Sequence, residues 1–294
     1  MLRIGENIHV IAREVSVALK ARDAKVMQEL AKKQAEAEVD YIDLNLGPAR
    51  RDPEAMAWLV QVVQEVTDTP LSLDTMNPLA MEAGLKVVKN KVLINSASNR
   101  TDSKQQMLPL AVKYNCDVVL SVITDQGCPG DFDGRVESIM EAAAYANELG
   151  IENERLWVDP IALPISSAGE GQKHSVAVLE FVKTLQDLVP GAKSTIGLSN
   201  VSNSTPEATR GILNRTYATM LARNTIYSCI VDSFDEEMVA LLTGKMPEAL
   251  NLIYKVMDGE DVSVAGLPKK TQEYVRTAKV LMGQVLYSDG WLED

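Results

Sequence analysis

The chain has 294 residues, and its net charge of −12 comes from 29 lysines and arginines against 41 aspartates and glutamates. Because nucleic acids and anionic membranes are polyanions, this charge disfavours both as partners. The cysteines form no CxxC pair, charges interrupt the start of the chain where a signal sequence would be apolar, and no apolar run is long enough to span a bilayer. We therefore expect a cytoplasmic protein that binds neither nucleic acid nor membrane.

Short, mostly β-branched runs bounded by turn residues are predicted as strands. In chain order they span residues 3–11, 40–47, 70–75, 91–96, 117–124, 155–160, 193–200 and 226–233. Their continuous apolar character is typical of strands that are buried on both faces, as in a parallel sheet.

Apolar residues at helical spacing predict helices between these strands. The clearest span residues 24–38, 53–66, 77–89, 104–114 and 135–149. Asp52 before Pro53 and Asn77 before Pro78 fit helix N-caps followed by a proline in the first turn. Pro109 argues against the helix at 104–114, because an interior proline removes a backbone donor.

Eight strands that alternate with about eight helices favour a closed (β/α)8 barrel, or TIM barrel, over an open doubly wound sheet, which would need an edge strand. We expect one domain over residues 1–294. Beyond the last strand, residues 236–246 and 271–287 are predicted as helices, separated by a polar stretch at 258–270. The C-terminal helix, at about 271–287, would pack on the barrel or on a partner subunit.

Polar residues recur where the apolar runs end. Strand carboxyl ends lie side by side at one rim of a barrel, where active sites are found. A helix cap or a turn would explain any one of these residues, but caps need not recur at the same depth of one rim. The set comprises Asp43, Asn45, Asp74, Asn95, Asp159, Asn200 and Asp232.

The mixture of aspartate and asparagine at this rim limits the chemistry of a ligand. Buried carboxylates need hydrogen-bond partners, and amides offer both a donor and an acceptor. One option among several is a neutral heterocycle with alternating N–H and C=O groups. A phosphate would instead call for arginine, lysine or a glycine-rich helix start.

Other motifs are weaker. His9 and His174 are isolated from each other and from the cysteines, so we expect no zinc, although a magnesium site built from aspartates stays open. Residues 169–174 (GEGQKH) miss the last position of a dinucleotide fingerprint and are interpreted as a mobile loop. Gly197 would let a flat ligand approach the backbone, with ordinary packing as the alternative. Arg210 would reach the pocket or a substrate carboxylate, unless it is simply an exposed arginine at a helix start.

Taken together, several segments resemble the pterin-binding methyltransferases. The closest resemblance is to the methyltetrahydrofolate:corrinoid protein methyltransferases of the acetyl-CoA pathway and of anaerobic O-demethylase systems. It extends from GENIH (5–9) through NRTYATMLA (214–222) to the final helix. The segments that carry it are LSLDT (71–75), INS (94–96), VDP (158–160) and GLSNVSN (197–203).

The resemblance implies a pterin-binding (β/α)8 barrel in a homodimer. Asp74, Asn95 and Asp159 would hold the pyrimidine side of the pterin, and Gly197 and Ser199 would line its ring. Further rim residues would be Asp43, Asn45 and Asp232.

The resemblance also implies a reaction. Asn200 would be the catalytic residue beside N5 of the folate, the atom that bears the methyl group, and Arg210 would lie near the folate tail. The methyl group would move, in either direction, between tetrahydrofolate and the cobalt of a corrinoid on a separate partner protein, because the chain lacks a DxHxxG motif that supplies a cobalt-binding histidine. No metal bound by the chain itself is implied. The loop at 204–209 looks longer than in the acetyl-CoA pathway enzymes.

Two alternatives stay open. One is dihydropteroate synthase, another pterin enzyme with this barrel, which would require a diphosphate site and a Lys-x-Arg motif near the last strand. There this chain has IVDSFDEE (230–237). The other is a non-catalytic barrel that only binds folate.

Overall fold

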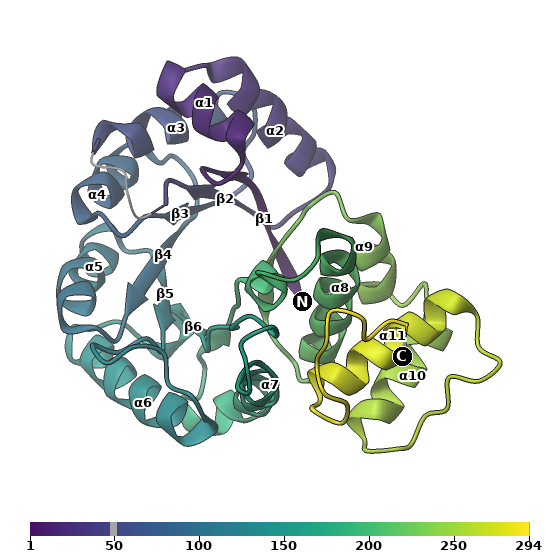
Figure 1. Ribbon diagram of the computed structural model, residues 1–294. Coiled ribbons are helices and arrows are strands. Elements are labelled where there is room, and N and C mark those ends of the chain that lie inside the picture. The colour runs from purple at the N-terminus through teal and green to yellow at the C-terminus, as the bar shows by residue number, and fades with distance from the viewer. Residues whose placement is uncertain (48–51, 294) are drawn as a thin grey trace.

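The computed structural model describes residues 1–47 and 52–293. In this part of the chain, eight parallel strands form one sheet in the order β7-β6-β5-β4-β3-β2-β1-β8, so that β1 pairs with both β2 and β8. The strands form a ring inside a ring of helices (Figure 1). They are β1 Leu2–His9, β2 Tyr41–Asn45, β3 Leu71–Asp74, β4 Val92–Ser98, β5 Asp117–Ser121, β6 Leu156–Asp159, β7 Lys193–Ser194 and β8 Ser228–Val231.

The barrel is nearly closed between β7 and β8. Ile230 N–H donates to the carbonyl of Ile196 at 2.9 Å, and Gly197 forms an isolated parallel bridge with Ile230. Tyr227 N–H donates to Ser194 Oγ at 2.9 Å. These contacts join the two ends of the sheet, and they confirm the predicted (β/α)8 barrel against the open-sheet alternative.

The helices that follow the strands make the outer layer. Helices α1 and α2 follow β1, one α-helix follows each of β2 to β7, and α9 to α11 follow β8. The α-helices are α1 Arg13–Ala21, α2 Ala24–Glu36, α3 Glu54–Gln64, α4 Pro78–Val87, α5 Thr101–Tyr114, α6 Phe132–Glu148, α7 Gly171–Leu188, α8 Glu207–Arg223, α9 Glu236–Leu242, α10 Pro247–Met257 and α11 Lys269–Leu281. Two short 3-10 helices are η1 Asn153–Arg155 and η2 Leu198–Ser202.

The N-cap of α4 forms as predicted, and the proline inside α5 does not interrupt that helix. Asn77 caps α4 as predicted, because its Oδ1 accepts from Leu79 N–H at 3.0 Å. Helix α5 continues through Pro109, which lies on the exposed side of the helix, so water can hydrate the carbonyl that loses its partner. Pro109 therefore does not interrupt α5, contrary to what an interior proline predicts.

Two predictions about chain segments near the mouth of the barrel are wrong. The predicted strand at 193–200 ends at Ser194, and the chain then turns into η2, where Ser202 Oγ donates to the carbonyl of Ser199 at 3.1 Å. Such local side-chain bonds compete with a sheet ladder. The predicted mobile loop at 169–174 instead contains the start of α7. At Gly171 an added Cβ would lie 2.3 Å from the carbonyl oxygen of Ile165, so glycine permits close packing there.

The C-terminal helix is present but shorter than predicted. Helix α11 ends at Leu281 rather than at 287, because Gly283 takes a left-handed conformation, with φ of 68°, just beyond the C-cap. Helices α10 and α11 lie beside α8, outside the ring (Figure 1). A cluster of buried residues that includes Tyr217, Ile253 and Tyr274 joins them to the barrel.

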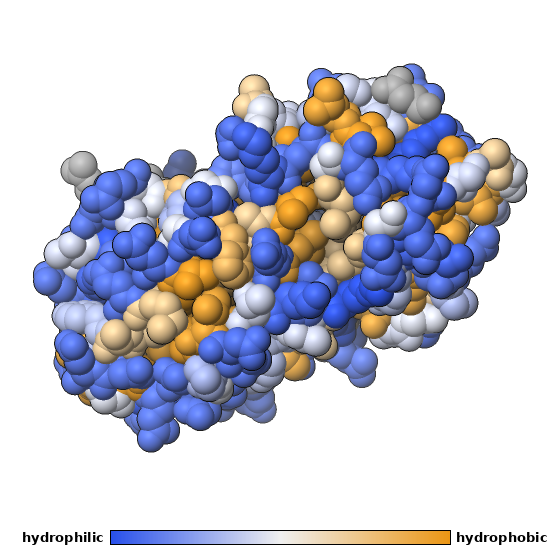
Figure 2. All heavy atoms as spheres, turned by 90° about the horizontal axis from the view of Figure 1, so that it is seen from below, coloured by the Kyte–Doolittle hydropathy of each residue, from blue (hydrophilic) through white to orange (hydrophobic). Residues whose placement is uncertain are grey.

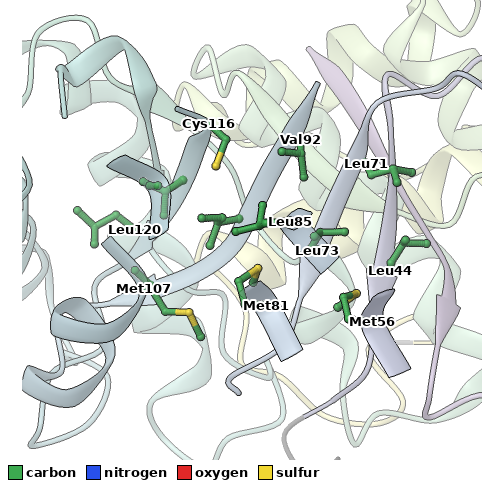
Figure 3. Close-up of a cluster of buried hydrophobic side chains, with 14 of the residues drawn as sticks. Leu44, Met56, Leu71, Leu73, Met81, Leu85, Val92, Met107, Cys116 and Leu120 are labelled. Atoms are coloured by element: carbon green, nitrogen blue, oxygen red, sulfur yellow. The ribbon is translucent and has the colours of Figure 1, made fainter. Parts of the chain in front are cut away.

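The main core lies between the sheet and the outer helices. Leucines of β2 and β3 meet methionines of α3, α4 and α5 (Figure 3). Each fully buried side chain of this kind contributes about 1.5–3 kcal/mol. The labelled members are Leu44, Met56, Leu71, Leu73, Met81, Leu85, Val92, Met107, Cys116 and Leu120.

The surface is mostly polar. On the face seen from below, hydrophilic residues surround a band of apolar residues that crosses the middle of the molecule (Figure 2). Among the described helices, none is both long and apolar enough to cross a membrane.

Candidate functional site

The carboxyl ends of the strands open into a cavity of about 820 Å³, here called the mouth cavity. All the residues proposed from the strand ends and from the family resemblance line it, so the structure brings them together in one place. They are Asp43, Asn45, Asp74, Asn95, Asp159, Gly197, Ser199, Asn200, Arg210 and Asp232.

Parallel register sets one wall of the cavity. Asn45, Asp74 and Asn95 are register partners on β2, β3 and β4, and Asn45 Nδ2 donates to Asp74 Oδ2. Asp43 lies deeper on β2, where its Oδ1 accepts from Ser72 Oγ at 2.6 Å and from Asn95 Nδ2 at 3.1 Å. The parallel register and the alternation of side chains therefore place these groups in two levels of the same wall.

Asp159 faces the cavity from the end of β6. Its side chain is 9% exposed, and its Oδ1 accepts from the backbone N–H of Ile161 at 2.7 Å. Ile161 has a φ of 59°, a left-handed conformation that is unfavourable for a β-branched residue. The chain after β6 therefore makes a tight turn that directs this carboxyl group into the cavity.

Glu6 and Asn7 of β1 also line the cavity, and the strand-end argument missed them. Glu6 is hydrogen-bonded to Ser199. Asn7 Nδ2 donates to Asp232 Oδ1 at 2.8 Å, which ties β1 to the loop after β8. The pairing of β1 with β2 shifts register between Gly5 and Ile8, and such a bulge redirects side chains. Only the polar residues inside the GENIH segment signal this in the sequence.

Burial dominates the electrostatics of two carboxyl groups from different sides of the cavity. It raises the pKa of Glu6 to about 7, against the hydrogen bond from Ser199, which lowers it. Burial likewise raises the pKa of Asp159 to about 7, against the backbone hydrogen bond from Ile161. Both groups can therefore gain or lose a proton near neutral pH, as acid–base groups do.

The wall formed by β2 to β4 shows the same effect. Burial raises the pKa of Asp43 to about 6, although hydrogen bonds from Ser72 and Asn95 lower it. Burial, together with the nearby negative charge of Asp43, raises the pKa of Asp74 well above its usual value. Among the described residues neither carboxyl group has a salt-bridge partner that would hold it ionised, so a ligand that donates hydrogen bonds would stabilise the charged forms.

The η2 segment and the start of α8 form the other side. At Gly197 an added Cβ would lie 3.2 Å from Asn200 Nδ2, so glycine allows this amide to fold back against the backbone. Arg210 is held only loosely, with Nη1 3.5 Å from Glu207 Oε2, whereas Arg215 Nε lies 2.8 Å from both carboxylate oxygens of Asp235. Arg210 is thus the arginine that is freer to contact a ligand.

Asp232 combines the two roles considered for strand-end residues, because it forms a turn and also faces the cavity. Its Oδ1 accepts from Phe234 N–H at 3.0 Å, as in a turn, and it also faces the cavity. His9 lines the cavity, and burial lowers its pKa. In the described residues, no group of three or more His, Cys, Asp or Glu side chains is arranged to hold a metal ion.

The ring of parallel strands and the polar mouth cavity define a (β/α)8 barrel with a ligand-sized site at its usual end. Residues 14–232 match the model of the pterin binding enzyme family. This match covers more than half of the chain, and the chain belongs to that family.

Two curated proteins are similar to this chain over most of its length. The chain is 25% identical over 245 residues to the methylcorrinoid:tetrahydrofolate methyltransferase of Eubacterium limosum, covering 82% of this chain and 89% of that protein. It is 23% identical over 275 residues to the methionine synthase of Mycobacterium leprae, covering 86% of this chain but 22% of that longer protein.

Solved structures support the fold alone. The dihydropteroate synthase of Vibrio fischeri ES114 superposes with a TM-score of 0.61 at 15% identity, covering 84% of this chain and 93% of that chain. The dihydropteroate synthase of Xanthomonas albilineans, in complex with 7,8-dihydropteroate, gives a TM-score of 0.59 at 17% identity, covering 84% and 92%.

Proposed function

We propose that the protein is a methyltransferase that moves a methyl group between N5 of tetrahydrofolate and the cobalt of a corrinoid on a separate protein. Its similarity to a methylcorrinoid:tetrahydrofolate methyltransferase over most of both chains supports this reaction. The structural observation that carries it is the set of buried carboxyl and amide groups gathered in the mouth cavity.

In this proposal Asp74, Asn95 and Asp159 bind the pyrimidine side of the pterin. The amino group and ring N–H of the pterin donate to the two carboxylates, and the Asn95 amide supplies a donor and an acceptor. Burial raises the pKa of both Asp74 and Asp159, so these pterin donors would offset the cost of ionising the carboxyl groups in the empty cavity. Gly197 and Ser199 line the ring, and Arg210 contacts the folate tail.

Transfer to cobalt breaks the bond between N5 and the methyl carbon. The Co(I) centre of the partner supplies the electron pair for the new cobalt–carbon bond, and N5 leaves as a neutral amine only if it gains a proton. Asn200 stabilises the developing geometry at N5 by hydrogen bonding. We assign Glu6 as the source of the proton, because its pKa of about 7 is near the pH of the cell and it is hydrogen-bonded to Ser199, next to Asn200.

The charge of the cavity favours this reaction over that of dihydropteroate synthase. A diphosphate substrate requires cations. Among the described residues that line the cavity there is no lysine, and Arg215 is already paired with Asp235 and Glu237. Among the described residues this leaves Arg210 to face several acidic groups, an arrangement that repels a diphosphate.

The proposal extends to the setting of the enzyme. It includes a corrinoid protein as partner, a homodimer, a single domain over 1–294, a cytoplasmic location, and a role in the acetyl-CoA pathway or in O-demethylation. An acidic surface, with a net charge of −12, would favour a partner of complementary charge.

Cobalt absorbance tests the reaction directly. Mixing the purified protein with tetrahydrofolate and a methylated corrinoid protein should convert the methyl-Co(III) spectrum to that of Co(I), and methyltetrahydrofolate with Co(I) should give the reverse change. If the protein binds folate but none of the candidate corrinoid proteins shows a spectral change, the result would instead support the non-catalytic barrel.

A further inference from the structure

Arg135 of α6 is a buried cation close to the proposed pterin site. Its side chain is 0% exposed. Its Nε donates to the carbonyl of Pro160 at 3.0 Å, Nη1 donates to the carbonyl of Asp131 at 2.9 Å, and Nη2 lies 3.1 Å from His174 Nδ1. No salt bridge of Arg135 is found within residues 1–47 and 52–293.

Such a position is costly for a guanidinium group. Removing a charge from water is unfavourable unless a counter-charge or a full set of hydrogen bonds replaces the solvent. Here neutral carbonyls and an imidazole take that place, so packing alone gives no reason for an arginine at this position. The reason for an arginine lies in which backbone groups it binds.

Arg135 holds the turn that directs Asp159 into the mouth cavity. The carbonyl that accepts from its Nε belongs to Pro160, the residue directly after Asp159. The next residue, Ile161, is the one with the left-handed backbone, and its N–H donates to Asp159 Oδ1 at 2.7 Å. A donor fixed to the middle of this three-residue turn restrains the carboxyl group at one end of it.

We propose that Arg135 is a positioning residue of the pterin site, which fixes the turn at 159–161 and places a positive charge behind the carboxylate of Asp159. The inference rests on the proposed function in taking Asp159 as a ligand of the pterin. It adds a residue that does not line the mouth cavity and that acts only through Asp159.

The surrounding charges support this role. Burial raises the pKa of Asp159 and Arg135 lowers it, while the charge of Asp159 contributes to the raised pKa of Asp74. Burial and the charge of Arg135 lower the pKa of His174, which keeps its Nδ1 free to accept a hydrogen bond. Other described groups around Arg135, His174 and Asp159 are Asp131, Glu170, Lys173, the hydroxyl of Tyr217, and the thiols of Cys128 and Cys229.

The test measures tetrahydrofolate binding by calorimetry from about pH 5 to about pH 9, the range that spans the carboxyl titration. Arg135→Gln removes the charge, and we expect the pH midpoint of binding to rise by about one unit and the affinity at pH 7 to fall about 10-fold. Because the reacting atoms are untouched, kcat at saturating folate should change less than KM. Arg135→Lys keeps the charge but not the planar guanidinium group. This variant should therefore bind tetrahydrofolate more weakly, with an unchanged pH midpoint of binding.

Lys104→Met is the matched control. Lys104 is also a buried cation, but it pairs with Glu141 at 2.7 Å and lies outside the mouth cavity. Its loss should lower stability and leave the pH midpoint unchanged. A wild-type midpoint in Arg135→Gln, or an equal shift in Lys104→Met, overturns the proposal. If Arg135→Gln does not fold, unaltered folate affinity in Arg135→Lys overturns it.

Carbon-13 NMR of labelled aspartate carboxyl groups, assigned with Asp159→Asn, separates this inference from the proposed function. If the wild type binds no folate, the proposed function fails. The titration of Asp159 in Arg135→Gln then still decides the role of Arg135, with an upward shift supporting it and an unchanged titration overturning it.

Discussion

The two ends of the barrel use the same strands for opposite purposes. At the amino ends, Trp157 is fully buried and makes edge-on ring contacts with Tyr41 and Tyr227 at centroid distances of 5.5 and 5.1 Å. Its Nε1 donates to Asp117 at 2.9 Å, and Lys193 pairs with the same carboxylate at 3.0 Å. We call these five residues the amino-end cluster. In it, aromatic packing and paired charges close the barrel.

At the carboxyl ends, four acids of the mouth cavity form no salt bridge within the described residues, although Arg215 pairs with Asp235 there. Buried carboxyl groups face one another there, and burial raises the pKa of Glu6, Asp43, Asp74 and Asp159. The difference shows that stability is concentrated at one end, while the other end keeps groups that are unfavourable until a ligand binds. In (β/α)8 barrels this is the usual division between the bottom and the catalytic face.

Among the substitutions, removing the central ring of the amino-end cluster should have the largest effect on stability. Trp157→Ala should lower the free energy of unfolding by about 3–5 kcal/mol, because it removes a large buried ring and leaves a cavity. Urea unfolding followed by circular dichroism measures this. At low temperature, where the variant is folded, its folate affinity should stay close to that of the wild type. A variant of wild-type stability would show that this cluster does not hold the barrel closed.

Asp74→Asn acts at the other end with two opposite results. Folate affinity should fall about 100-fold, since a charge-assisted hydrogen bond from the pterin is lost. Stability of the free protein at neutral pH should rise, since a buried acid whose pKa is raised destabilises the folded state above its unfolded pKa. Calorimetric titration and thermal unfolding on the same samples measure both. A decrease in both quantities would contradict the comparison between the two ends.

Asn200→Ala separates binding from chemistry within the mouth cavity. We expect methyl transfer to slow about 10- to 100-fold, the effect of losing one hydrogen bond to a developing charge. Folate affinity should change much less. Stopped-flow cobalt absorbance alongside folate titration measures the two quantities. Turnover at the wild-type rate would remove Asn200 from the mechanism.

The pH dependence of stability tests the same comparison without a substitution. Because the pKa of Glu6 and of Asp159 is about 7 in the folded protein, these groups stay protonated after the unfolded chain has lost its protons. These two groups should therefore lower the free energy of unfolding, by about 3 kcal/mol each, as pH rises from about 4 to about 7. Glu6→Gln should reduce this fall, and urea titrations across that range measure it. A rise in stability over the same range would contradict the raised pKa values.

The sequence predicted the barrel and most of the mouth cavity because both follow from strand periodicity. Aspartates and asparagines at the ends of apolar runs must converge when the strands are parallel, and they do. Glu6 was missed because only strand ends were considered, whereas Glu6 lies within β1, two residues after Ile4 and on the same inward face. The end of β7 was also misplaced, because local hydrogen bonds in η2 replace the sheet ladder there.

Arg135 shows a different limit of sequence reading. It lies in a segment, RVESIM, whose charged residues are typical of an exposed helix face, yet the arginine is fully buried. Its partners are backbone carbonyls of Asp131 and Pro160, and no residue pattern marks a carbonyl as an acceptor. Such a contact depends on the placement of α6 against the turn after β6, which only the folded structure reveals.

The central claim is that a pterin binds by donating hydrogen bonds to carboxyl groups that are partly protonated in the empty mouth cavity. The most direct measurement is the number of protons exchanged on tetrahydrofolate binding, from calorimetry near pH 7 in buffers of different ionisation enthalpy. The account predicts a net release of protons that shrinks in Asp74→Asn and in Asp159→Asn. Binding with no proton release, or with uptake, would contradict it.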